Sequence, residues 1–213
     1  MRPPEDWRRA RLTLGIAGAT AAAWFLAWGL GLTEPAAIKG GFIPVRVMGV
    51  EGDENFVPAF LTPLTATLVH GGLMHVVFNL LMLLFCGRAV ETILGGRQLA
   101  ILYVAGAYAA AAAQFAVNPE SIDPVIGASG AIAAVLGAYS MLFGRNRVKV
   151  ANPKLALWLN ALWLAAGWVV LQMIVGFTFE TSGTRIAVAA HVGGFLAGLL
   201  LAKPLLLLRY RGA

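Results

Sequence analysis

Residues 127–144 read GASGAIAAVLGAYSMLFG, an apolar segment without a charged side chain that carries a serine close to its start. Ser129, Ala133 and Gly137 recur four residues apart, so they share one face of a helix. Small residues on such a face let two helix backbones approach closely inside a membrane. The segment therefore predicts a membrane-spanning helix that packs tightly on a neighbour and presents a hydroxyl near its beginning.

The composition of the whole chain is that of a membrane protein. Charged residues make up 12% of the 213 residues and hydrophobic residues 59%, whereas an ordinary soluble domain is roughly 25% charged. Six segments are long enough, or nearly so, to cross about 30 Å of hydrocarbon. Their approximate bounds are 12–32, 71–87, 98–117, 127–144, 155–177 and 186–207. We expect an all-α membrane protein with six transmembrane helices.

The expected organisation is a cytoplasmic N-terminal tail at 1–11, one membrane domain at 12–208 and a short C-terminal tail at 209–213. Within the membrane domain, residues 33–69 form a long outer loop with four prolines and no strong helical period. Loops of this length are usually functional or membrane-associated. The aromatic and aliphatic residues of this loop argue against a solvated linker.

Basic residues indicate the orientation, because cytoplasmic loops collect Lys and Arg. With both termini inside, 13 of the 16 basic residues face the cytoplasm and 7 of the 10 acidic residues lie outside. The net charge of +6 then needs no nucleic-acid partner, since these residues belong beside an anionic inner leaflet. We expect both termini in the cytoplasm and, without an organelle address, a bacterial inner membrane.

Four polar side chains lie inside the predicted spans, namely His75, Asn79, Ser129 and His191. A polar group in a bilayer is costly unless it is paired or used, so such a cluster is a candidate functional site. Counted at about 1.5 Å per residue from the nearest inner-face charge, Ser129, His75 and His191 lie about 24, 20 and 18 Å from the inner boundary. All three therefore lie roughly 6–12 Å below the outer surface of a core about 30 Å thick. Asn79 shares the face of His75 one turn deeper.

Ser129 and His191 are the residue types of a nucleophile and its general base. His191, Gly194 and Gly198 line one face of the sixth span, and packing that face on the Ser129 face would bring hydroxyl and imidazole together. The imidazole could take the serine proton and return it to a leaving amine. A helix start also offers unpaired amides to an oxyanion. The competing interpretation, packing motifs alone, does not explain the shared depth.

Four motifs follow one another along the chain: HGGLMHVVFN at 70–79, GRAVETILG at 87–95, GASG at 127–130 and AHVGG at 190–194. In this order and spacing the chain resembles the rhomboid family, intramembrane serine proteases with a six-helix core. The resemblance implies that Ser129 is the nucleophile and His191 the general base. It also implies an oxyanion hole made by His75, Asn79 and the amide of Ser129.

The resemblance further implies structural roles for the other motif residues. His70 would hold the first loop against the start of the second span, with a plain loop histidine as the alternative. Glu91 would have a structural role on the cytoplasmic side, with a solvated surface charge as the alternative. Close backbone approach is expected at the motif glycines Gly87, Gly95, Gly127, Gly130, Gly194 and Gly198. Ala133 departs from the family, many of whose members carry an aromatic residue there that packs on the base.

No cofactor or metal is expected. Every Asp and Glu lies outside the spans or near their ends, so we infer a Ser/His dyad rather than a triad. His75 and His191 are two ligands without a carboxylate or thiolate at their depth, whereas catalytic zinc usually has three protein ligands. Cys86, the single cysteine, is expected to be an inert packing residue.

The first functional hypothesis is a cofactor-independent endopeptidase in the lipid bilayer that cleaves transmembrane segments of other proteins near the outer face. The alternative is a catalytically weak or inactive rhomboid-like factor that binds membrane proteins. A transporter or channel ranks last, because the inner halves of the spans are almost wholly apolar. The sequence leaves the oligomeric state open.

Overall fold

The computed structural model describes residues 7–50, 56–143 and 187–211, with single positions and short stretches between 152 and 170. Within these residues the chain is helical, and its β pairing is one isolated bridge between Phe42 and Val125. The long helices are α1 (Arg11–Gly29), α4 (Leu73–Met82) with α5 (Arg88–Leu94), α6 (Gly96–Val117), α7 (Ser129–Phe143) and α9 (Val188–Arg209). The prediction of an all-α fold is confirmed.

Four segments are long and apolar enough to cross a membrane: α1, the continuous segment Leu73–Leu94, α6 and α9. α7 is apolar but shorter. The second predicted span, 71–87, continues to Leu94 because a π turn at Leu83–Gly87 joins α4 to α5 without ending the helix. The fifth predicted span, 155–177, falls largely outside the described residues, so the count of six helices remains a prediction.

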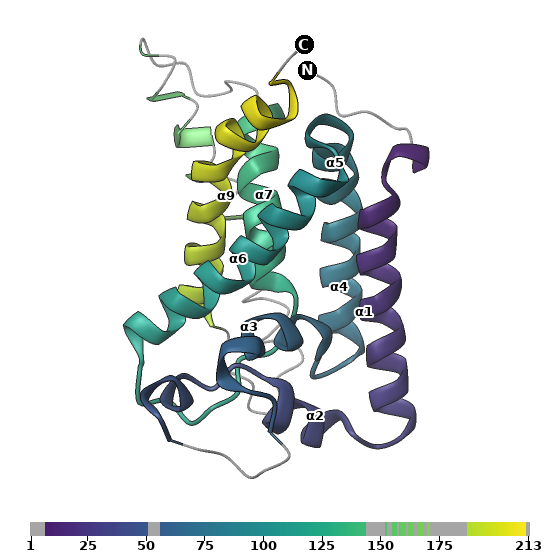
Figure 1. Cartoon of the computed structure of the whole chain (residues 1–213), viewed down its shortest axis with the longest axis vertical. Helices are drawn as coiled ribbons and strands as arrows, with labels where there is room; N and C mark the ends of the chain where they lie inside the picture. The colour runs from purple at the N-terminus through teal and green to yellow at the C-terminus, as the bar shows by residue number, and fades with distance from the viewer. Residues whose placement is uncertain are drawn as a thin grey trace.

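α7 is the central helix of the bundle. Figure 1 shows α1 and α4 at one edge, α6 crossing in front of α7 and α9 at the opposite edge, and α7 contacts both α6 and α9. Twelve of the 15 residues of α7 are buried, as expected for a helix that is apolar on every face. The start of α1 and the end of α9 lie at the same end of the bundle (Figure 1).

Glycines bring α9 onto α7. A side chain at Gly194 would collide with the backbone carbonyl of Gly130, and one at Gly198 with the carbonyl of Ala134. The predicted contact between two small-residue faces is therefore present. Gly194 thus faces the residue that follows Ser129, and Gly198 faces the residue that follows Ala133 on α7.

The outer loop has more regular structure than we predicted. Residues 33–69 contain α2 (Thr33–Gly40), a 3₁₀ turn at Pro44–Met48 and a series of short helical turns from Ala59 to Leu68 that includes α3 (Thr62–Thr65). These turns are too short to give a strong helical period in the sequence, and Pro44 and Pro63 occupy first turns, where a missing N–H breaks no helical bond. The Thr65 hydroxyl donates to the Gly40 carbonyl at 2.6 Å and ties α3 to α2.

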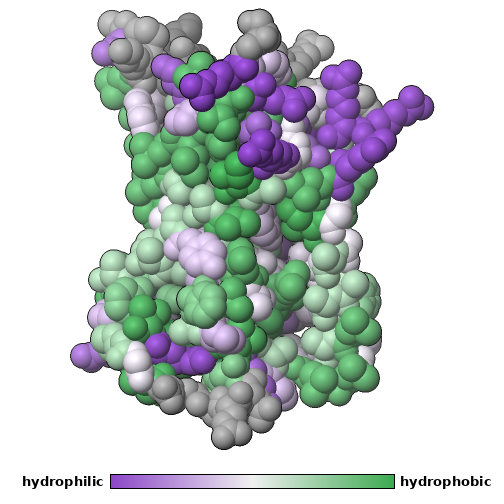
Figure 2. Space-filling model, in the orientation of Figure 1, coloured by the Kyte–Doolittle hydropathy of each residue, from purple (hydrophilic) through white to green (hydrophobic). Residues whose placement is uncertain are grey.

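The surface divides into a polar end and an apolar middle. Figure 2 shows hydrophilic side chains gathered at the end where α1 begins and α9 ends, with hydrophobic residues along the helices below. Large apolar side chains such as Phe25, Phe85 and Leu200 are exposed on these helices. Apolar helices with such an exposed surface indicate an integral membrane protein.

Candidate active site

Ser129 and His191 meet inside the bundle. Ser129 is the first residue of α7, and His191 lies in the first turn of α9. The distance from Ser129 Oγ to His191 Nε2 is 2.7 Å, which is a hydrogen bond. The two residues are only 7% and 5% exposed. This separation allows direct proton transfer from the hydroxyl to the imidazole.

The other ring nitrogen of His191, Nδ1, is buried and has no hydrogen-bond partner in the described part of the chain. When Nε2 accepts the serine proton, Nδ1 carries the hydrogen of the neutral ring. Ala133, which is fully buried, lies against Gly194, and this pair of small residues keeps α9 close to α7. Within the described residues, the hydrogen bond to Ser129 Oγ is the one that holds the imidazole.

His75 and Asn79 approach the same region from α4. A Cβ on Gly127 would lie 2.5 Å from His75 Nε2, so this imidazole rests on the backbone two residues before Ser129. Asn79 is completely buried one turn further along α4, and its Nδ2 donates to the His75 carbonyl at 2.8 Å. Because an amide nitrogen carries two hydrogens, Asn79 retains one for another acceptor.

The start of α7 supplies backbone donors. The first helical bond runs from Ile132 N to Ala128 O at 2.9 Å, so the amides of residues 129–131 precede the helical ladder. Gly127 has a φ of +105°, which an L-residue with a side chain rarely adopts, and it turns the chain into the helix. These amides and the positive end of the helix dipole favour a negative charge beside Ser129.

His70 lies beside the turn that carries Ser129. It is 1% exposed, and its Nε2 accepts a hydrogen bond from Ala128 N at 3.4 Å. Its ring packs edge-to-face on His75 with 4.9 Å between centroids. Burial, together with the neighbouring His75, lowers the pKa of His70 to about 3. His70 is a wall of the site, and the plain loop histidine is excluded.

Glu91 lies at the opposite end of the bundle. It is 4% exposed, and its carboxylate accepts hydrogen bonds from Leu12 N, Thr13 N and Thr13 Oγ1 at 2.7–2.9 Å. The carboxylate thus caps the start of α1, and the solvated surface charge is excluded. A side chain at Gly87 would contact Thr13, and Gly95 has a φ of +84°. A side chain is disfavoured at Gly87 by the neighbouring Thr13 and at Gly95 by the backbone conformation.

Sequence reasoning missed the backbone contacts that hold the loop before α7. Phe42 and Val125 exchange two backbone hydrogen bonds, of 3.0 and 2.8 Å, and Gly127 N donates to Ala66 O at 2.9 Å. The outer loop therefore anchors the turn that carries Ser129. Backbone pairing of this kind leaves little signal in residue type, beyond an aromatic and a β-branched residue at the bridge.

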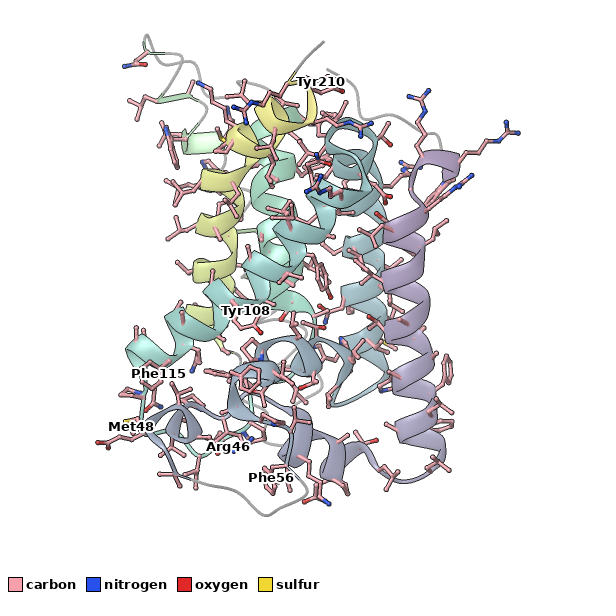
Figure 3. All side chains as sticks on the ribbon, viewed as in Figure 1. Arg46, Met48, Phe56, Tyr108, Phe115 and Tyr210 are labelled. Carbon is pink, nitrogen blue, oxygen red and sulfur yellow. The ribbon has the colours of Figure 1, made fainter. Side chains whose placement is uncertain are left out.

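Tyr108 adds a side-chain tie between the outer loop and α6. Its hydroxyl donates to the Phe60 carbonyl at 2.9 Å, and Figure 3 shows Tyr108 on α6 above the outer loop. On the same loop, the Arg46 guanidinium lies over the Phe56 ring and donates to Val57 O at 3.0 Å (Figure 3). The loop is thus fixed at several points around the site.

The chain is similar in sequence to proteins of one known family. A family model described as the Rhomboid domain matches residues 59–208. Rhomboid protease GluP of Bacillus subtilis is 33% identical over 142 residues, which cover 67% of this chain and 25% of that protein. Rhomboid protease GlpG of Pectobacterium atrosepticum is 31% identical over 135 residues, covering 63% and 45%. Rhomboid-related protein 2 of Mus musculus is 29% identical over 133 residues, covering 62% and 43%. The chain therefore spans less than half the length of these three relatives.

Proposed function

The chain belongs to the rhomboid family, and on that premise we propose that it is an intramembrane serine endopeptidase that cuts transmembrane segments of other proteins near the outer face. The observation that carries the proposal is the 2.7 Å hydrogen bond between Ser129 Oγ and His191 Nε2 within an apolar bundle. A buried hydroxyl–imidazole pair is the minimal arrangement for nucleophilic acyl transfer.

The reaction uses the pair twice. Ser129 Oγ attacks the scissile carbonyl carbon while His191 Nε2 takes the hydroxyl proton. The tetrahedral intermediate collapses by breaking the C–N bond, and the imidazolium gives its proton to the leaving amine. An acyl group then remains on Ser129. Water attacks this ester with His191 again as base, which releases the second product and restores the hydroxyl.

The negative oxygen of each intermediate would be stabilised by three kinds of donor. The amide of Ser129, the ring of His75 and the free Nδ2 hydrogen of Asn79 come from two helices around the nucleophile. One such donor contributes on the order of 3 kcal/mol in other serine hydrolases. We assign them to the oxyanion hole, where fixed donors compensate for the missing third member of a triad.

The position of Ser129 supports cleavage below the membrane surface. Ser129 is the first residue of α7, and counted at about 1.5 Å per residue from the inner-face charge at Arg145 it lies about 24 Å from the inner boundary of a hydrocarbon core roughly 30 Å thick. A helix that starts at Ser129 thus sets the nucleophile at a depth that a transmembrane substrate can reach. The substrate helix must unwind locally, because its peptide bonds are otherwise engaged in helical hydrogen bonds. The family resemblance suggests small residues at the cut and helix-breaking residues nearby.

The test is to incubate the purified protein in proteoliposomes with single-span fusion proteins and to map the products by mass. We expect one cut near the outer end of the span, lost in Ser129→Ala and in His191→Ala. Cleavage that persists in purified Ser129→Ala protein would overturn the proposal. We further propose a bacterial inner-membrane location with both termini in the cytoplasm, which reporter fusions at the two ends would check.

A second candidate is a non-catalytic factor that binds membrane proteins. It is favoured by Ala133, which is buried at the position where many family members pack an aromatic residue on the base. This candidate predicts capture of single-span proteins without cleavage, and capture that is unchanged by Ser129→Ala.

A further inference from the structure

The turn that precedes the nucleophile is held from two sides by its backbone. Gly127 N donates to Ala66 O at 2.9 Å, and Ala128 O accepts the first helical bond of α7 from Ile132 N. Between these two bonds, Ala128 N donates to a side chain, the Nε2 of His70, at 3.4 Å. His70 is thus the side chain in the described residues that binds the backbone of this turn.

The hydrogen bond between Ala128 N and His70 influences the direction in which the Ser129 amide points. That amide shares a peptide plane with the Ala128 carbonyl, so its direction depends on the backbone torsions at Ala128. The bond to His70 fixes the nitrogen side of Ala128, and the bond from Ile132 fixes its carbonyl side. With both sides fixed, the Ser129 N–H points away from the helical ladder and has no backbone acceptor within the described ranges.

His70 can accept this bond only when Nε2 carries no proton, so the neutral ring must hold its hydrogen on Nδ1. Burial and the neighbouring His75 favour the neutral ring, since they lower the pKa of His70 to about 3. The ring also packs on His75, and His75 in turn contacts Gly127. His75 and His70 therefore contact two consecutive residues of this turn, Gly127 and Ala128.

We propose that His70 is a positioning residue for this reaction: its neutral Nε2 holds the Ala128 amide and thereby aims the Ser129 amide at the oxyanion. The inference rests on the proposed function. His70 does not touch the reacting atoms, so its effect is on the rate of acyl transfer and not on substrate affinity.

The experiment compares His70→Leu, which removes the acceptor, with His70→Gln, whose neutral amide oxygen can take the place of Nε2. Thr67→Val is the control, because it removes the hydrogen bond from the Thr67 hydroxyl to Leu64 O in the same loop and leaves the backbone bond from Gly127 N to Ala66 O in place. Each protein is assayed for kcat and KM on a transmembrane reporter, for the rate of fluorophosphonate labelling, for Tm, and for hydrogen exchange of a peptide covering residues 125–131.

We expect His70→Leu to lower kcat and the labelling rate on the order of 100-fold at unchanged KM, as loss of one oxyanion donor does. His70→Gln should recover most of that loss. Exchange at the Ala128 amide should speed up in His70→Leu alone. Thr67→Val should lower Tm while kcat stays within about twofold, since the lost hydrogen bond contributes to stability and does not act on the oxyanion.

A folded His70→Leu protein with wild-type kcat would overturn the inference, and so would His70→Gln and His70→Leu that are equally impaired. If His70→Leu does not fold, His70→Asn takes its place, because the shorter amide cannot reach Ala128, and the same loss of kcat is expected. A wild-type protein that neither labels nor cleaves overturns the proposed function itself. Wild-type labelling with an unaffected His70 variant overturns the role of His70 alone.

Discussion

The starts of α1 and α7 are two helix N-termini that the protein treats in opposite ways. At α1, the carboxylate of Glu91 accepts hydrogen bonds from two backbone amides and one hydroxyl. At α7, no carboxylate approaches within the described residues, and Ser129 stands beside amides that precede the first helical bond. Both sites offer the same unpaired amides and positive dipole end. The start of α1 is saturated and stabilises the fold, while the start of α7 is left open, as the proposed oxyanion of the reaction requires.

The largest expected effect is the loss of cleavage when residues at the start of α7 and their partner on α9 are changed. Ser129→Ala and His191→Ala should each reduce cleavage by about 10⁵- to 10⁶-fold, as removal of either member of such a pair does in other serine proteases. Tm should change little, because each variant removes one hydrogen bond. Steady-state cleavage of a transmembrane reporter is the measurement. A His191→Ala protein that kept a tenth of the activity would show that another group acts as base.

Glu91→Ala should give the largest loss of stability, on the order of 3–5 kcal/mol, because it removes a buried charge acceptor from several donors at once. Equilibrium unfolding in mixed micelles measures it, and Glu91→Gln, which keeps part of the hydrogen bonding, is the matched variant. Cleavage per folded molecule should stay near wild type. A strong loss of kcat in folded Glu91→Gln would contradict the separation of the two ends.

Asn79→Ala should lower kcat by roughly 100-fold, about 3 kcal/mol, with KM nearly constant, since the lost donor acts on the oxyanion. The comparison variant is Ser140→Ala on α7, whose hydroxyl donates to Gly137 O at 2.7 Å, away from the site. That variant should keep its kcat. Equal losses in kcat for the two variants would argue that packing is disturbed and that no donor role exists for Asn79.

Gly194→Ala should destabilise the protein by about 1–3 kcal/mol, because its methyl group would be forced against the Gly130 carbonyl. The displaced α9 carries His191, so kcat should fall as well. Gly18→Ala on α1 has open space around the added carbon and serves as the control. Thermal unfolding should give a lower Tm for Gly194→Ala than for Gly18→Ala. Equal Tm values would refute the tight contact between α7 and α9.

The last effect, small near neutral pH, is a pH dependence of stability from His70. Its folded pKa of about 3 lies below the ordinary value of 6.5, so the unfolded chain takes up the proton first as the pH falls. Stability from the neutral ring is complete above about pH 6.5 and declines toward pH 3, by up to about 1.4 kcal/mol per pH unit. Unfolding of His70→Gln between pH 7 and 5 should show a shallower decline. Identical slopes for the two proteins would contradict a buried neutral His70.

Much of the site follows from sequence because a membrane makes polar residues informative. Depth counting and small-residue faces were enough to place Ser129 opposite His191, and the helix bounds of α6, α7 and α9 came within a few residues. The burial of Glu91 could not be predicted in the same way. Its carboxylate is buried only because α1 begins beside it, and the sequence does not show where α1 begins relative to Glu91.

The outer loop shows where sequence patterns fail. The Phe42–Val125 bridge joins segments far apart in the chain through backbone atoms alone. The bond from Ala128 N ends on the side chain of His70, but nothing in the residue type of Ala128 marks it as the donor. The turns around Pro44 and Pro63 are too short for a helical period to be visible. The π turn at Leu83–Gly87 likewise changes the helix without any glycine–proline signal before it.

The most direct test is to find which atom a serine-directed fluorophosphonate modifies in the membrane-embedded protein. Mass mapping of the labelled chain should place a single adduct on Ser129, and the adduct should disappear in His191→Ala while Glu91→Gln still forms it. An adduct on another residue, or undiminished labelling of Ser129 without His191, would contradict a nucleophile activated by that imidazole.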